Sequence, residues 1–129
     1  MKITMGQALD AYLALRRMQA EKIRFSTEDS LRLVRLKKLL HLEAGAFAEA
    51  EQALIEKYAE KDEAGAPVMQ GPGQFVIAAG QAADYTRELK EIRATEIKLA
   101  HQPFDIAAAG ISLDMEIVEA LDGLVNFGG

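Results

Sequence analysis

A long stretch without proline, Thr27 to Glu63, places the strongest constraint on how this chain can fold. It contains a single glycine, and its apolar residues follow one another at steps of three and four. That spacing places them on one side of an α-helix. They are Leu33, Leu36, Leu40, Ala44, Phe47, Ala50, Leu54 and Tyr58.

A helix of that length does not fit inside a compact molecule of this size. At 1.5 Å per residue it would measure roughly 55 Å. A globule of 129 residues has a radius of gyration of only about 14 Å. The sequence therefore predicts an elongated, mainly α body with one long central helix, which is either bent or covered by a second copy of the chain.

Signals for three further helices surround the long one. Thr4 and Gln7 form a capping box before an amphipathic stretch that runs to about Glu21. Ser26 is then the expected N-cap of the long helix. A third helix is predicted over residues 79–99 and a short C-terminal helix over residues 112–125, followed by a tail at 126–129. We expect one domain, residues 1–129, built as a helical hairpin or bundle of about four helices.

One segment between the helices has a different pattern. Two short apolar arms flank Gly71-Pro72-Gly73, which predicts a small β-hairpin over residues 67–77. An isolated pair of strands is marginally stable in water. The hairpin should therefore pack on the helices or pair with another extended stretch, for which residues 2–4 and 104–106 are candidates.

Composition excludes several classes of protein. The chain has no cysteine, which rules out a disulfide scaffold, thiol catalysis and thiolate zinc sites. It shows neither the pattern of a signal peptide nor an apolar run of membrane-spanning length. We expect a cytoplasmic protein without membrane contact, and a component of a virus particle assembled in a host cell would have the same features.

Charge is divided unevenly along the chain. Residues 1–42 hold nine Lys and Arg against four acidic residues, a balance of +5, and residues 43–129 hold six against sixteen, a balance of −10. Two interpretations stay open. The basic end can lie beside acidic residues of a later helix, where exposed pairs contribute little, or it can meet a partner of opposite charge.

No group of residues predicts catalysis, a metal site or a bound cofactor. His41 and His101 lie sixty residues apart and neither belongs to a metal-ligand motif. We interpret His41 as a surface residue and His101 as a helix-end residue. The acidic cluster of Glu56, Glu60, Asp62 and Glu63 lacks the apolar pocket that separates the pKa values of catalytic carboxyls.

A basic patch on the long helix is the candidate contact surface. It consists of Arg32, Arg35, Lys37, Lys38 and His41. Phosphate binding requires such a patch, but the chain is acidic overall and no aromatic residues are interleaved with these cations. The pattern therefore favours a protein partner with an acidic surface over direct binding of nucleic acid.

The long helix also carries apolar residues outside its main stripe. Leu31, Val34, Leu39 and Leu42 lie on other sides of its first half, so the helix must be covered widely. Either the remaining helices cover it or the chain forms a homodimer. Gly45, which lies among several alanines, indicates either close helix packing or a bend.

One segment also resembles a known family. The run Ile55-Glu56-Lys57-Tyr58-Ala59-Glu60-Lys61-Asp62-Glu63, followed by Gly65 and Pro67-Val68, is similar to small proteins of unknown function carried by phages and prophages of Gram-positive bacteria. The chain departs from that pattern in its alanine richness, as at residues 107–109. The resemblance implies phage origin and a compact helical fold, and it implies no catalytic or binding residues.

These observations together predict a non-enzymatic phage or prophage protein that acts through protein–protein contacts. Its role would lie in particle assembly or as an accessory factor, with a phage or host protein as the partner. The alternative is a phage-encoded inhibitor of a bacterial defence system that docks on a host effector. An enzyme is the third hypothesis, and a deep pocket with convergent polar groups would favour it.

Overall fold

The computed structural model describes residues 1–128, and it confirms the prediction of a mainly α chain with about four helices. The helices are α1 (Met5–Ala20), α2 (Thr27–Tyr58), α3 (Ala82–Ala94) and α4 (Met115–Ala120). The strands form pairs: β1 (Lys2–Thr4) with β4 (Glu96–Lys98), β2 (Met69–Gly71) with β3 (Gln74–Phe75), and β5 (Phe104–Ala107) with β6 (Val125–Gly128). The first two pairs are antiparallel and the third is parallel.

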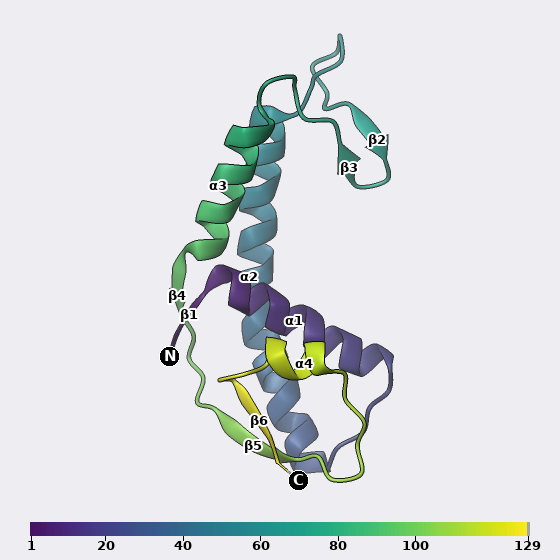
Figure 1. Ribbon diagram of the computed structural model, residues 1–129, viewed down its shortest axis with the longest axis vertical. Helices are drawn as coiled ribbons and strands as arrows, with labels where there is room; N and C mark the ends of the chain where they lie inside the picture. The colour runs from purple at the N-terminus through teal and green to yellow at the C-terminus, as the bar shows by residue number, and fades with distance from the viewer. Residues whose placement is uncertain (129) are drawn as a thin grey trace.

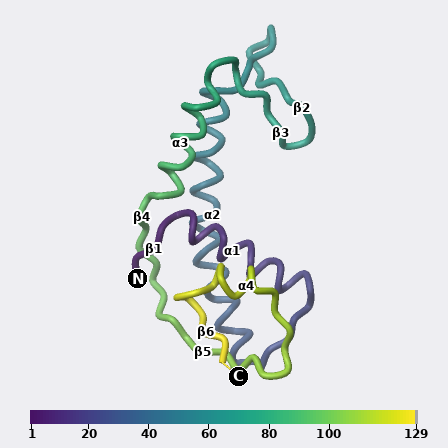
Figure 2. Tube along the Cα trace, viewed as in Figure 1, coloured from purple at the N-terminus to yellow at the C-terminus, as the bar shows by residue number. Residues whose placement is uncertain are grey.

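The helix α2 runs through most of the length of the molecule (Figure 1). Near its N-terminal half lie α1, α4 and the β5–β6 pair, and we call this part the head. Beside its C-terminal half lies α3, with the β2–β3 hairpin to one side of the helix end (Figure 1). We call residues 44–94 the arm. The β1–β4 pair joins the two parts, close to the N-terminus (Figure 2).

The main apolar core lies in the head. Leu36 and Leu40 of α2 are 1% and 0% exposed, and Ile106 of β5 is 1% exposed. Together with Ile117 of α4 and Leu121, which follows α4, these are the largest fully buried side chains. Because several elements converge on the same side of α2, this half of the helix is well covered on that side.

The arm has a much thinner core. Its buried residues are Leu54, Ile55, Tyr58 and Ala59, and α3 contributes only half-buried side chains such as Tyr85 and Leu89. Tyr58 packs edge-on against Tyr85 with 6.3 Å between ring centroids. Two helices alone cannot enclose an apolar layer, so the arm remains open along its outer sides.

Local signals start the first two helices where the sequence predicts them. The Thr4 hydroxyl accepts a hydrogen bond from the amide of Gln7 at 3.1 Å, and the Gln7 side chain accepts one from the amide of Thr4 at 2.8 Å. This is the predicted capping box. Ser26 caps α2 by accepting from the amide of Asp29 at 3.2 Å.

The ends of the helices differ from the prediction. The long helix stops at Tyr58, because Ala59 is extended and residues 59–61 pair with the strand segments around Pro67 and Ile77. The third helix stops at Ala94, where Thr95 is extended and β4 begins. Both stretches of sequence would tolerate a helix, but pairing with a distant strand determines their conformation.

The C-terminal helix predicted over residues 112–125 is wrong in its bounds. It spans only Met115–Ala120, with Asp114 as N-cap in place of Ser112. Gly123 has a positive φ of 80°, which few other residues adopt. The chain then turns into β6, so the predicted tail is a strand as far as Gly128, and Gly129 lies outside the described residues.

The predicted hairpin forms within residues 67–77, but the proposed pairing with residues 2–4 or 104–106 is wrong. The amide of Glu60 donates to the carbonyl of Val76 at 2.8 Å, and the amide of Val68 donates to the carbonyl of Glu60 at 2.7 Å. The hairpin therefore pairs with the segment that leaves α2. Residues 2–4 pair with β4 and residues 104–106 with β6.

Candidate protein-contact site

A groove between α1 and α2 is the surface hollow that takes in most of the predicted basic patch. Tyr12 of α1 lies across from His41 of α2, with 2.9 Å between the tyrosine hydroxyl and Nδ1 of the imidazole. The guanidinium of Arg16 lies 5.9 Å from the centre of the Tyr12 ring. The groove is lined by Tyr12, Gln19, Val34, Lys37, Lys38, His41 and Leu42.

A second hollow continues this groove toward the loop between the two helices. It is lined by Leu15, Met18, Gln19, Ile23, Phe25, Ser30, Leu33, Val34 and Lys37, most of which are apolar. The two hollows share Gln19, Val34 and Lys37, and the ammonium of Lys37 donates to the side-chain oxygen of Gln19. Together they form one groove with an apolar floor and cations at its rim.

The structure divides the five residues of the predicted patch between different sides of α2. Lys37, Lys38 and His41 line the groove. Arg32 lies elsewhere, paired with Glu28 at 2.7 Å and stacked 5.9 Å from the centre of the Phe104 ring. Arg35 is exposed and lines neither hollow. The sequence identifies the basic residues of the groove. It does not identify Tyr12 and Gln19, because these residues reach the groove only through the crossing of α1 over α2.

The first interpretation of the uneven charge, internal pairing, applies to part of the basic end. Arg17 of α1 pairs with Asp114 and, at 3.6 Å, with Glu116, so acidic residues at the start of α4 neutralise it. Within residues 1–128, Lys37 and Lys38 take part in no ion pair. Of these two, Lys37 donates a hydrogen bond to the neutral side chain of Gln19.

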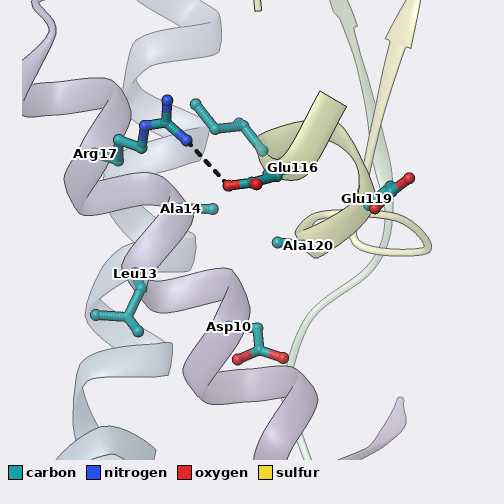
Figure 3. A pocket seen from close by; sticks show the side chains of 8 residues that line it. Asp10, Leu13, Ala14, Arg17, Glu116, Glu119 and Ala120 are labelled. Carbon is teal, nitrogen blue, oxygen red and sulfur yellow. Dashed lines mark ion pairs between the residues drawn. The ribbon is translucent and has the colours of Figure 1, made fainter. Parts of the chain in front are cut away.

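A second concave surface lies between α1 and α4 (Figure 3). Leu13, Ala14 and Ala120 form its apolar part, and its acidic side chains are Asp10, Glu116 and Glu119. Figure 3 shows these three carboxylates pointing in different directions. Asp10 pairs with Arg93 at 3.1 Å and Glu116 with Arg17. Asp10 and Glu116 are therefore engaged by arginines of different helices, α3 and α1.

A small polar cluster joins the two helices of the arm. The ammonium of Lys57 lies 3.2 Å from the carboxylate of Glu88, and 5.0 Å from the centre of the Tyr58 ring. Interaction with the Tyr58 hydroxyl, then with Lys57, lowers the pKa of the Glu88 carboxyl. The same carboxylate raises the pKa of Lys57. The cluster links α3 to the end of α2.

His101 has a different role from the predicted one. It lies after β4, and its Nε2 is 3.0 Å from the backbone carbonyl of Leu124. Its ring packs edge-on against Phe104, with 5.6 Å between centroids. His101 therefore links the β5–β6 pair to the turn after α4. Across residues 1–128, no three histidine or acidic side chains lie close enough to hold a metal ion.

Comparison with known proteins adds no further site. Neither models of known protein families, nor curated proteins, nor solved structures match this chain. Among the described residues, none of the helices combines the length and the apolar character needed to cross a membrane.

Proposed function

We propose that this chain is a non-enzymatic phage or prophage protein that acts through protein–protein contacts, in particle assembly or as an accessory factor. An elongated helical body, built around one long central helix, presents the contact surfaces. The resemblance of residues 55–68 to small phage proteins supports the phage origin.

The groove between α1 and α2 is the observation that carries this proposal. Apolar residues form its floor, and Lys37, Lys38 and His41 stand at its rim without an acidic partner among residues 1–128. Exposed apolar surface rimmed by polar groups is typical of protein contact sites. A segment that presents apolar side chains flanked by carboxylates fits both features, so we propose an acidic amphipathic partner.

A pull-down from infected or lysogenic cells, analysed by mass spectrometry, tests this function. We expect the wild-type chain to capture a specific phage or host protein. The double variant Lys37→Glu, His41→Glu should lose it, since like charges would face the partner's acidic residues. A matched control, Lys90→Glu with Lys98→Glu, reverses two exposed charges outside the groove and should retain it.

Two outcomes would count against parts of the proposal. If the double variant Lys37→Glu, His41→Glu still captured the partner, the partner would bind outside the groove. Mass spectrometry of purified virions separates the two roles, because an assembly protein that stays in the particle would be found there. Its absence would leave only the accessory role.

Inhibition of a bacterial defence system is the second candidate function. At the far end of the arm, the side chains of Glu56, Glu60, Asp62 and Glu63 are all exposed. An acidic surface of this kind can occupy a basic groove of a host effector. A plaque assay on a defended host tests it, and an efficiency of plating that does not depend on the gene would contradict it.

A further inference from the structure

The side of α2 that faces away from the core is exposed along most of the helix. The helices α1 and α3 both lie on the near side of α2 in Figure 1. On the opposite side, residues at steps of three and four are all exposed. These residues, which we call the outer face, are Leu31, Val34, Arg35, Lys38, Leu42, Gly45, Ala46, Glu49, Gln52, Ala53 and Glu56.

The outer face contains exposed apolar side chains and a glycine with open space beside it. Leu31, Val34 and Leu42 are 50%, 47% and 71% exposed. A Cβ added to Gly45 would meet nothing within 4 Å. A glycine inside a helix is less favourable than alanine by about 1 kcal/mol. Packing within this chain, one of the two predicted roles of Gly45, is therefore wrong, and the predicted bend stays a prediction.

The charges of the outer face are arranged so that the face is complementary to itself. Its N-terminal half carries Arg35 and Lys38, and its C-terminal half carries Glu49 and Glu56. Within residues 1–128 the ion pairs of α2 use Arg32 and Lys57, and Lys38 and Glu49 take part in none. Two copies placed antiparallel bring each basic half against an acidic half.

We propose that the outer faces of two copies pack together, antiparallel, around a two-fold axis that crosses α2 between Glu43 and Ala44. In this register Lys38 of one copy faces Glu49 of the other, and each pair occurs twice. Leu42 faces Gly45, where the missing side chain allows the helices to approach closely. A two-fold axis requires one self-complementary surface of this kind.

The size of the face sets the expected strength of association. It holds about half of the roughly 20–30 residues that each partner contributes to a standard interface. We therefore expect reversible dimers with dissociation constants in the micromolar range. Val34, Lys38 and Leu42 belong to both the groove and the outer face, whereas Tyr12, Lys37 and His41 line the groove only. The variant Lys37→Glu, His41→Glu therefore changes the groove alone, and Glu49→Lys changes the outer face alone.

Sedimentation velocity on the purified full chain, from about 1 to about 300 µM, is the first test, since this range brackets weak transient contacts. Wild type should shift from monomer to dimer. Lys38→Glu and Glu49→Lys should each weaken self-association roughly tenfold or more, because each places like charges opposite one another. Lys90→Glu and Glu119→Lys, exposed charges off the face, should leave it unchanged, and circular dichroism should show equal helix content throughout.

Mixing the two charge variants tests the register directly. In a mixed dimer, the glutamate introduced at position 38 would face the lysine introduced at position 49, and the unchanged Lys38 and Glu49 would face each other. An equimolar mixture should therefore dimerise more strongly than either variant alone. A wild type that stays monomeric over the whole range, unaffected single reversals, or a mixture that fails to associate would each overturn the proposal.

Disulfide crosslinking distinguishes antiparallel from parallel packing. The chain has no cysteine, so single introduced thiols report without background. Leu42→Cys lies near the proposed axis and should crosslink to itself. Leu31→Cys should not, yet it should crosslink to Glu56→Cys in a mixture. Efficient self-crosslinking of Leu31→Cys would indicate a parallel pair and contradict the proposal.

Discussion

The helix α2 passes through both the head and the arm, and its two halves meet different surroundings. In the head, α1 and α4 together with the β5–β6 pair enclose Leu36 and Leu40 almost completely. In the arm only α3 covers the helix, and α3 itself has no buried residue. The same three-and-four spacing of apolar residues therefore gives a closed core in one half and an open contact in the other.

This difference shows that burial depends on how many elements converge on a helix and not on its pattern alone. Apolar spacing decides which side of α2 faces inward. The number of covering elements decides how much surface leaves water, and the free energy gained follows that area. The arm, in which α2 and α3 extend away from the head, keeps helix surface exposed. The proposed contacts with other molecules require such a surface.

Removing a core leucine from each region should give the largest contrast. Leu36→Ala in the head should lower the free energy of unfolding by about 2–5 kcal/mol, since a cavity remains in a closed core. In the arm, Leu54 is 9% exposed. Leu54→Ala should lower the free energy of unfolding by less than about half of the loss in Leu36→Ala, because the open site relaxes or admits water.

Urea denaturation followed by circular dichroism measures both variants. Leu13→Ala, at a side chain that is 57% exposed, is the matched control and should change the free energy of unfolding by less than about 0.5 kcal/mol. Equal losses for Leu36→Ala and Leu54→Ala would show that head and arm are equally well packed, contrary to the comparison.

The capping box of α1 should have the next largest effect. Thr4→Ala removes the hydroxyl that accepts from the amide of Gln7 and should lower the free energy of unfolding by about 1 kcal/mol. Ser26→Ala removes the cap of α2, a longer hydrogen bond without a reciprocal partner, and should lower it less. If Thr4→Ala left the midpoint of urea denaturation unchanged, the capping box would not contribute to the stability of the head.

Gly45 should give a stabilising change at the junction of head and arm. Gly45→Ala in dilute solution, where the chain is monomeric, should raise the free energy of unfolding by about 0.5–1 kcal/mol, because alanine is the better helix former and the site is open. Gly80→Ala is the control of opposite sign, since Gly80 has a positive φ of 80°. Loss of stability in Gly45→Ala would show that a side chain at position 45 meets a neighbour within the monomer, contrary to the open space around Gly45.

The polar cluster of the arm should give the smallest effect, visible through its pH dependence. The pKa of Glu88 is lowered in the folded state, so its stabilisation is present above the unfolded-state pKa and is lost as the pH falls through the folded-state pKa. Lys57, with a raised pKa, contributes below its unfolded-state pKa and loses that contribution as the pH rises through the folded-state value.

Titration of the side chains by NMR measures these shifts, with Glu88→Gln as the comparison. In that variant the pKa of Lys57 should return toward its ordinary value, and the acid-side loss of arm stability should become smaller. A Glu88 carboxyl that titrates at its ordinary pKa would show that the Lys57–Glu88 pair does not hold the arm together in solution.

Much of the helical fold could be predicted from local signals. Thr4 with Gln7 and Ser26 with Asp29 mark helix starts through contacts three residues apart, so the sequence contains them fully. The end of α2 at Tyr58 and of α3 at Ala94 could not be predicted, because both depend on strands that pair over long distances in sequence. The parallel β5–β6 pair is a long-range contact of the same kind.

The candidate site could be predicted only in part. Lys37, Lys38 and His41 are identifiable as a group because one helix carries them at close spacing. Tyr12 and Gln19 join them only through the crossing of α1 over α2, which no local pattern specifies. Arg32 has the same charge, but it lies five residues before Lys37 and so faces another side of α2, where its guanidinium lies beside the Phe104 ring.

Amide hydrogen exchange along α2, measured at several protein concentrations, tests the central comparison most directly. Residues 33–40 in the head should exchange slowly at every concentration, and residues 46–53 in the arm should exchange faster in dilute solution and slow down as copies associate. Uniform protection along α2 that does not change with concentration would contradict both the open arm and the proposed contact between copies.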